Sequence, residues 1–234
     1  MPSTSERTFG SKLANAETIA THLKTFTGYT PPTTDTSIAN YNALIASVKA
    51  ENSSLTTKQA AYSAAIDVRQ KHFTKEITSI DKILSPIIAN VRATMGKSAK
   101  EASAITTLIT KIRGVKVKKP KSGDKAEAIS QSERSFGSVT QNFSDIVTIL
   151  GTLNTNYAPV KTNLKLAALK TKLADITTAN NTATTTYSAL KATIDNRSSK
   201  YKELSEKTQR IKEAIKSQYG VSSSEYKLIK GLTV

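Results

Sequence analysis

Apolar residues recur at alternating intervals of three and four residues from Leu166 to Ile215. This spacing places them on one face of a helix, and its persistence over about seven heptads is typical of a long helix that pairs with another helix. Subtracting 128 from each residue number gives a second stripe with the same spacing, from Ile38 to Ile87. The sequence therefore predicts two copies of one helical unit, and this internal repeat limits the possible folds more than any other feature.

The signals that begin and end helices also recur in both copies. Similar hexapeptides, Ser5–Gly10 and Ser132–Gly137, open the two copies, and a proline follows each first helix. Asp35 and Asn163 precede the stripes at the positions where helix N-caps belong. Each copy is predicted to contain a short helix, a long helix and a second short helix, over residues 11–26, 36–95 and 99–113 and over residues 138–153, 164–219 and 224–230.

The predicted fold is all-α, an elongated helical bundle with the long helices as its spine. We expect a first helical repeat at residues 1–113, a basic linker at 114–131 and a second repeat at 132–234. The two repeats are expected to pack as one bundle. Three places could interrupt the long helices, namely the asparagine-containing segments at 52–54 and 180–182, the segments 69–73 and 197–201, and Pro86. Continuous long helices are favoured, and a bend in them is allowed.

Polar residues at four stripe positions recur between the two copies, and a buried polar group there costs stability unless it has a partner. They are Asn52 with Asn180, and Arg69 with Arg197. In a helical seam such residues fix register and orientation. The alternative is that they line a polar groove. Asp67 and Asp195 precede the two arginines by two residues, and salt bridges between the aspartate of one copy and the arginine of the other are the simplest interpretation.

The chain is strongly basic, with 34 Lys and Arg against 18 Asp and Glu and a net charge of +16. Such a charge attracts nucleic acid or an acidic membrane surface, but it also suits a lysine coat that keeps a helical bundle in solution. The linker and the end of the second long helix hold the clearest candidates for polyanion contact, which are Lys116, Lys118, Lys119, Lys121 and the lysines along residues 200–216.

The residues that could carry catalysis are few. There is no cysteine and no glycine-rich phosphate loop, and the two histidines, His22 and His72, do not recur in the other copy. Packing or surface positions are the favoured interpretation for both histidines. Phe9 and Phe136 are interpreted as plugs of the core rather than as ligand-stacking rings. The sequence predicts no enzyme, no metal site, no cofactor and no small-molecule substrate.

The N-terminal residues are polar and no apolar run approaches the length of a membrane-spanning helix, so a cytoplasmic protein is expected.

The chain also resembles an uncharacterised bacterial family of duplicated helical-bundle proteins. The resemblance rests on Ser132, Ser135 and Phe136, on the turn Tyr157-Ala158-Pro159, and on the C-terminal segments 219–226 and 230–232. These motifs are structural, so the resemblance implies the two-copy fold and no particular activity.

The leading functional hypothesis is a non-enzymatic structural or interaction protein, a scaffold for a protein partner or for self-assembly. It is based on the long seam and the duplication. The first alternative is a protein that binds nucleic acid without sequence specificity through its lysines. The second is a helical protein that acts on membranes, which the modest apolar content disfavours.

Overall fold

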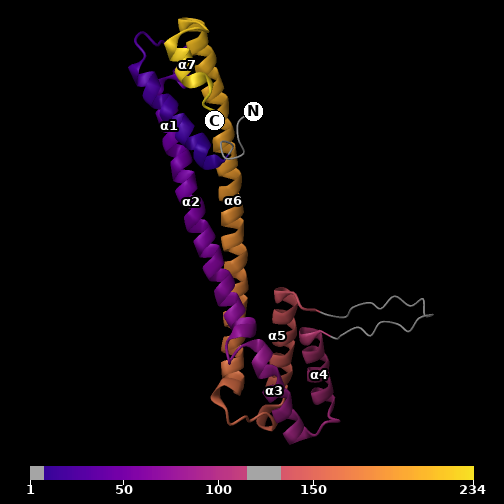
Figure 1. Ribbon diagram of the computed structural model, residues 1–234. Coiled ribbons are helices and arrows are strands. Elements are labelled where there is room, and N and C mark those ends of the chain that lie inside the picture. Colours follow the sequence, from indigo (N-terminus) through magenta and orange to yellow (C-terminus); the bar gives the residue numbers. More distant parts are fainter. Residues whose placement is uncertain (1–7, 115–132) are drawn as a thin grey trace, which may run out of the picture. The chain divides into compact units, whose positions relative to one another are not determined.

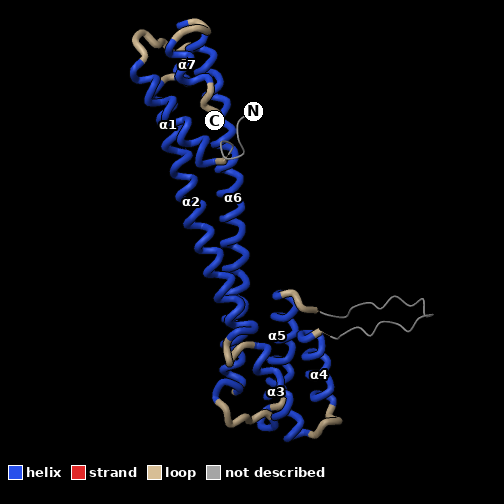
Figure 2. The backbone as a smooth tube through the Cα atoms, in the orientation of Figure 1, coloured by secondary structure: helices blue, strands red, loops and turns tan. Residues whose placement is uncertain are grey.

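The computed structural model describes residues 8–114 and 133–234, and within these ranges the chain is helical with no strand (Figure 2). The helix-rich composition and the two stripes account for this class. The α-helices are α1 (Phe9–Thr25), α2 (Ile38–Gln70), α3 (Ile80–Met95), α4 (Lys100–Arg113), α5 (Phe136–Thr152), α6 (Leu166–Tyr219) and α7 (Ser224–Lys230). The shorter elements are η2 (Thr34–Thr36), the π-turn η3 (Lys71–Lys75), η4 (Asn154–Asn156) and η5 (Thr162–Leu164).

The described helices include none that is both long enough and apolar enough to cross a membrane.

The helices form two compact units. Unit 1 comprises residues 1–61 and 188–234, of which residues 8–61 and 188–234 are described. It combines α1 and the first part of α2 with the last part of α6 and α7 (Figure 1). Within it, α2 and α6 run antiparallel, because Tyr41 contacts Thr208 whereas Asn52 contacts Tyr201. Its core includes Ala16, Ile19, Leu23, Tyr41, Val48, Leu204, Ile211 and Ile229.

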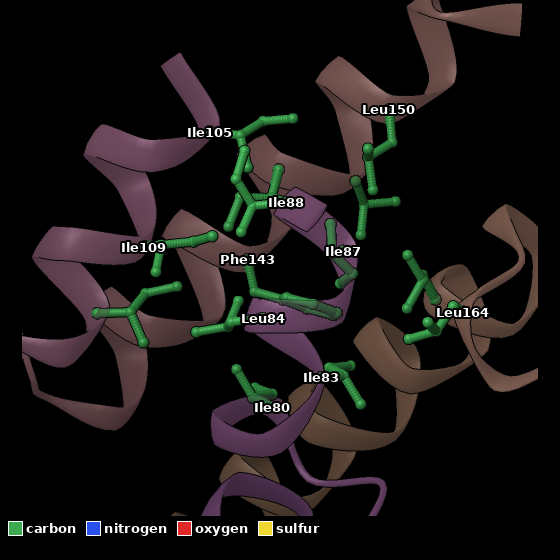
Figure 3. Packing of buried hydrophobic residues seen from close by; sticks show 14 of the residues in the cluster. Ile80, Ile83, Leu84, Ile87, Ile88, Ile105, Ile109, Phe143, Leu150 and Leu164 are labelled. Atoms are coloured by element: carbon green, nitrogen blue, oxygen red, sulfur yellow. The ribbon is translucent and has the colours of Figure 1, made fainter. Parts of the chain in front are cut away.

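Unit 2 comprises residues 62–187 and contains the end of α2, then α3, α4, α5 and the first part of α6. Side chains from α3, α4 and α5 converge on one region, with Phe143 of α5 among them (Figure 3). Phe143 has no exposed surface, and its neighbours in the core include Ile80, Leu84, Ile87, Ile105, Ile109, Leu150 and Leu169.

These two units divide the chain differently from the predicted sequence repeats. Unit 1 contains the first half of one predicted repeat and the last half of the other, and the described part of unit 2 contains the remaining halves. The predicted boundaries at 113 and 132 therefore describe segments of sequence, whereas unit 1 combines segments from both ends of the chain and unit 2 is the continuous stretch between them.

The first long helix is not continuous, so the prediction of one helix over residues 36–95 is wrong. After the π-turn η3 the backbone becomes extended at Glu76, and α3 begins after Ser79. Glu76 occupies the stripe position that Leu204, fully buried, occupies in α6. A carboxylate cannot take that buried place without a partner, so the chain leaves the helix there and Glu76 is exposed. Pro86, the third suspected interruption, lies inside α3 and does not end it.

The second long helix, α6, is continuous through both of its suspected interruptions, at residues 180–182 and 197–201. The N-cap prediction for the long helices is wrong. Asp35 lies within η2 and Asn163 within η5, one short turn before each long helix begins. At the start of α2 the backbone N–H of Asn40 donates instead to Ser37 Oγ, at 3.2 Å.

Candidate functional site

In unit 1 an arginine covers the aromatic residue that begins α1. Arg197 lies with its guanidinium carbon 4.2 Å from the ring centre of Phe9 and 5.7 Å from that of Tyr201. Its Nε donates to Asn52 Oδ1 at 2.8 Å, and Asn52 Nδ2 donates to the Tyr201 hydroxyl at 2.9 Å. Phe9 is 40% exposed, so the prediction that it fills the core is wrong. Its ring lies at the surface, stacked against Arg197. We name these four residues the Arg197 cluster.

Unit 2 contains the corresponding arrangement at the start of α5. Arg69 lies 3.9 Å from the ring centre of Phe136, and Phe73 packs edge-on against the same ring at 4.9 Å between ring centres. Phe136 packs against the core of unit 2, as predicted for a core plug. Asn180 Nδ2 donates to the Phe136 carbonyl at 3.2 Å and to Thr140 Oγ1 at 3.1 Å. We name Arg69, Phe73, Phe136 and Asn180 the Arg69 cluster.

The two clusters differ in the hydrogen bonds of their arginine and asparagine. Arg197 Nε and Asn52 Oδ1 bond to each other, whereas Arg69 Nε and Asn180 Oδ1 are both buried and have no partner in the described part of the chain. Both clusters sit where a short helix meets a long one, and Thr8 and Ser135 cap those short helices. The polar residues of the stripes thus lie beside the starts of α1 and α5, and their role in fixing register stays a prediction.

The predicted aspartate–arginine bridges are not formed. Asp67 pairs with Lys71 and Lys75, both at 3.0 Å, and Asp195 pairs with Lys191 at 3.4 Å. Residues two apart on a helix point to different faces, so each aspartate points away from the face that carries the arginine. The aspartates instead reach lysines of their own helix or of the adjoining π-turn.

The lysines along residues 200–216 are engaged within unit 1. Lys212 donates to the carbonyls of Lys230 and Leu232, and burial lowers its pKa. The other four lysines face carboxylates, in the pairs Lys200–Glu203, Lys202–Glu206, Lys207–Asp35 and Lys216–Glu213. Each pair cancels local positive charge, so this part of α6 attracts phosphate less than the number of lysines alone would suggest.

Asp35 connects the start of α2 with α6. It pairs with Lys207, which is 7% exposed, and with Arg210, both at 2.7 Å. The hydrogen bond from Lys207 is the main cause that lowers the pKa of Asp35, and the bond from Arg210 acts in the same direction. Asp35, which was predicted to cap a helix, therefore joins η2 to α6 through ion pairs instead.

The two histidines occupy different surroundings. The ring of His22 lies parallel to that of Phe26 with 6.5 Å between ring centres, and His72 Nδ1 lies 3.3 Å from Lys172 Nζ. Across residues 8–114 and 133–234, no three His, Asp or Glu side chains lie close enough together to hold a metal ion.

A polar groove between α3 and α4 was not anticipated from the sequence. It has a volume of about 610 Å³ and is lined by Ser85, Ile88, Ala89, Arg92, Thr106, Ile109, Thr110, Arg113 and Gly114. Arg92 and Arg113 lie on different helices and neither recurs in the other copy, so no sequence pattern links them. The predicted linker lysines, Lys116, Lys118, Lys119 and Lys121, lie outside the described residues.

Two buried tyrosines have strongly raised pKa values. Tyr41 is fully buried, and burial raises its pKa to about 12, although the hydrogen bond to Thr208 acts in the opposite direction. Because the Thr208 hydroxyl donates to the Leu204 carbonyl, Tyr41 donates to Thr208 Oγ1, at 2.7 Å. Burial likewise raises the pKa of Tyr157 to about 12, and its hydroxyl donates to the Leu164 carbonyl.

These tyrosines predict a loss of stability in alkaline solution. Between the ordinary pKa of 10.0 and the raised value of about 12, the unfolded chain releases the Tyr41 proton while the folded chain keeps it. Stability is therefore complete below pH 10 and falls as the pH rises, by about 2–3 kcal/mol for Tyr41. Urea unfolding at pH 10 and pH 12 measures this loss, which should be smaller in Tyr41→Phe. Equal losses in both proteins would contradict it.

No family model, curated protein or solved structure matches the chain. The resemblance to a bacterial family of duplicated helical proteins therefore stays a prediction.

Proposed function

We propose that the protein is a non-enzymatic interaction protein that assembles with a second copy of itself through the part of α6 in unit 2. The observation that carries this proposal is the absence of charge along residues 176–187, in a chain whose net charge is +16. The facing end of α2, residues 62–66, is uncharged as well.

Charge decides where two copies of this chain can meet. Two molecules that each carry +16 repel each other, and the repulsion extends over about 10 Å at 0.1 M salt. An uncharged stretch of helix is the place where close approach costs least. Threonine, alanine and asparagine fill this stretch, and small side chains allow a neighbouring helix to pack closely.

An aromatic pair supplies apolar surface at the end of this stretch. Tyr187 is 52% exposed, and its ring centre lies 5.5 Å from that of Tyr62. Tyrosine is enriched at protein interfaces because its large ring buries apolar area while its hydroxyl keeps a hydrogen bond. The stripe of α6 is fully buried at Ile176 but partly open at Tyr187, and also at Ile194, which is 48% exposed.

We also infer that the chain is a duplicated, coiled-coil-like pair of repeats whose segments are exchanged between the two units. Support comes from equivalent contacts made at offsets of 127 or 128 residues. Arg197 on Phe9 corresponds to Arg69 on Phe136. The Tyr29 hydroxyl donates to the Thr36 carbonyl, as Tyr157 does to Leu164, at an offset of 128 for both residues.

Sedimentation equilibrium across protein concentration tests self-association. We expect a reversible dimer whose affinity rises with salt, because salt screens the repulsion between the copies. Tyr187→Lys should weaken the dimer by about ten-fold or more. Leu228→Lys is the matched control, because Leu228 is 50% exposed in α7 and the change of charge is the same. A monomer at every concentration, or equal effects of both variants, would refute the proposed assembly.

The nucleic-acid alternative predicts the opposite salt dependence. Binding of phosphates releases counterions and weakens steeply as salt rises. Five of its candidate lysines, between residues 200 and 216, are already engaged with carboxylates or carbonyls, which favours the assembly proposal.

A further inference from the structure

The groove between α3 and α4 gathers positive charge without a balancing carboxylate. Arg92 and Arg113 both line it, and no Asp or Glu does. Within the described residues neither arginine forms an ion pair, in contrast to Arg210, which pairs with Asp35. Two guanidinium groups facing one groove repel each other, and an anion between them would relieve that repulsion.

The present partners of both arginines are neutral hydroxyl groups. Arg92 donates to Thr106 Oγ1 at 3.0 Å, and Arg113 donates to Ser85 Oγ at 2.7 Å. A guanidinium carries five N–H donors in a planar fork, so each arginine keeps most of its donors after one such bond. Arg92 Nε is also buried without a partner in the described part of the chain.

The rest of the lining suits a bound oxyanion. Ser85 accepts from Arg113, and its own hydroxyl proton remains to be donated. Thr106 and Thr110 donate to backbone carbonyls of α4, so their oxygens help to position the arginines rather than contact a ligand as donors. Ile88 and Ile109, which are 9% and 5% exposed, contribute apolar surface to the lining. Apolar surface beside a guanidinium lowers the local dielectric and strengthens charge-assisted hydrogen bonds.

We propose that the α3–α4 groove is a binding site for a phosphate group, held by Arg92 and Arg113 with Ser85 as an additional donor. A phosphate dianion offers several acceptor oxygens and matches the fork of a guanidinium in the bidentate manner. The volume of about 610 Å³ exceeds that of one phosphate and leaves room for the molecule that carries it. The phosphate belongs either to a small phosphorylated molecule or to a nucleic-acid backbone.

The site is independent of the proposed assembly through residues 176–187, since it uses α3 and α4 alone. Its test therefore succeeds or fails whatever the oligomeric state.

Titration of the full-length protein with inorganic phosphate, followed by NMR of the arginine Nε–H signals, tests the site directly. Chloride is exchanged for phosphate at constant ionic strength. We expect the signals of Arg92 and Arg113 to shift and saturate, while the signal of Arg210, already paired with Asp35, does not follow the same curve. Shifts that never saturate, or that are equal for all three arginines, would show a general ionic effect and overturn the proposal.

Matched variants separate binding from folding. Arg92→Gln and Arg113→Gln should each weaken phosphate binding by about ten-fold or more, because each removes a charged donor. Arg210→Gln removes the same charge from unit 1 and should leave the affinity unchanged. Circular dichroism of each variant checks the fold, and the titration of the unmodified protein stands if a variant fails to fold. Equal loss in all three variants would contradict the site.

A competition experiment between inorganic phosphate and DNA identifies the molecule that supplies the phosphate group. A short mixed-sequence DNA duplex that displaces inorganic phosphate from the Arg92 and Arg113 signals at low salt supports the site and assigns it to nucleic acid. Saturable phosphate binding that the duplex does not disturb supports the site and assigns it to small phosphorylated molecules.

Discussion

Replacing Phe143 with alanine is expected to lower the free energy of unfolding by about 3–5 kcal/mol. Phe143 is fully buried in the core of unit 2, among isoleucine and leucine side chains of α3 and α4 (Figure 3). Truncation removes the ring and leaves a cavity, which branched neighbours with few rotamers fill poorly. Urea unfolding monitored by circular dichroism measures the change.

Val160 provides the control for this substitution. It is 96% exposed, so Val160→Ala should change stability by less than about 0.5 kcal/mol. If Phe143→Ala costs no more than the control, the described core of unit 2 is incorrect.

Removal of the Arg197 side chain is expected to cost about 2–3 kcal/mol, the second largest effect. Arg197→Ala uncovers the Phe9 ring and leaves Asn52 Oδ1 without its donor. Arg69→Ala should cost about 1 kcal/mol less, because Arg69 stacks on Phe136 but makes no corresponding bond through Nε. Unfolding of both variants in urea measures the difference.

A double-mutant cycle measures the bond between Arg197 and Asn52, which has no counterpart between Arg69 and Asn180. Arg197→Ala combined with Asn52→Ala should show a coupling energy of about 1 kcal/mol or more, whereas Arg69→Ala with Asn180→Ala should show less. An equal or larger coupling in the Arg69 cluster would mean that the two clusters are bonded alike, against the geometry described.

The helices and their buried faces follow from local sequence. The stripe identifies Tyr41, Val48, Leu204 and Ile211 as core residues, and all four are buried. A period of three and four residues is a property of the helix itself, so it can be recognised without knowledge of the partner.

The break in the first long helix begins in segment 69–73, one of the three predicted interruptions, and Glu76 is a further signal of it. Glu76 stands in the stripe where the second copy has Leu204, and a charged residue at a core position predicts that the helix cannot remain in register. Pro86 is the more obvious helix breaker, yet α3 begins at Ile80 and includes it. A charged residue at a stripe position is thus a better guide to the break than the low helix propensity of proline.

The contacts between distant segments could not be predicted. The stripe marked Arg69 and Arg197 as exceptional, but it contains no information on which aromatic ring each would cover. Phe9 lies far from Arg197 in the sequence, and only packing of the chain brings them together. The same holds for Arg92 and Arg113, whose shared groove depends on how α3 and α4 pack.

The central claim is that each compact unit draws on both sequence repeats, and hydrogen exchange in Phe143→Ala tests it most directly. Phe143 belongs to the second predicted repeat, whereas α3 and α4 belong to the first. Loss of the ring lowers the stability of whatever packs with it, and amides in the same cooperative unit lose protection together. The account predicts faster exchange in α3, α4 and α5 with little change in α7. Faster exchange in α5 and α7 with α3 and α4 unchanged would contradict it.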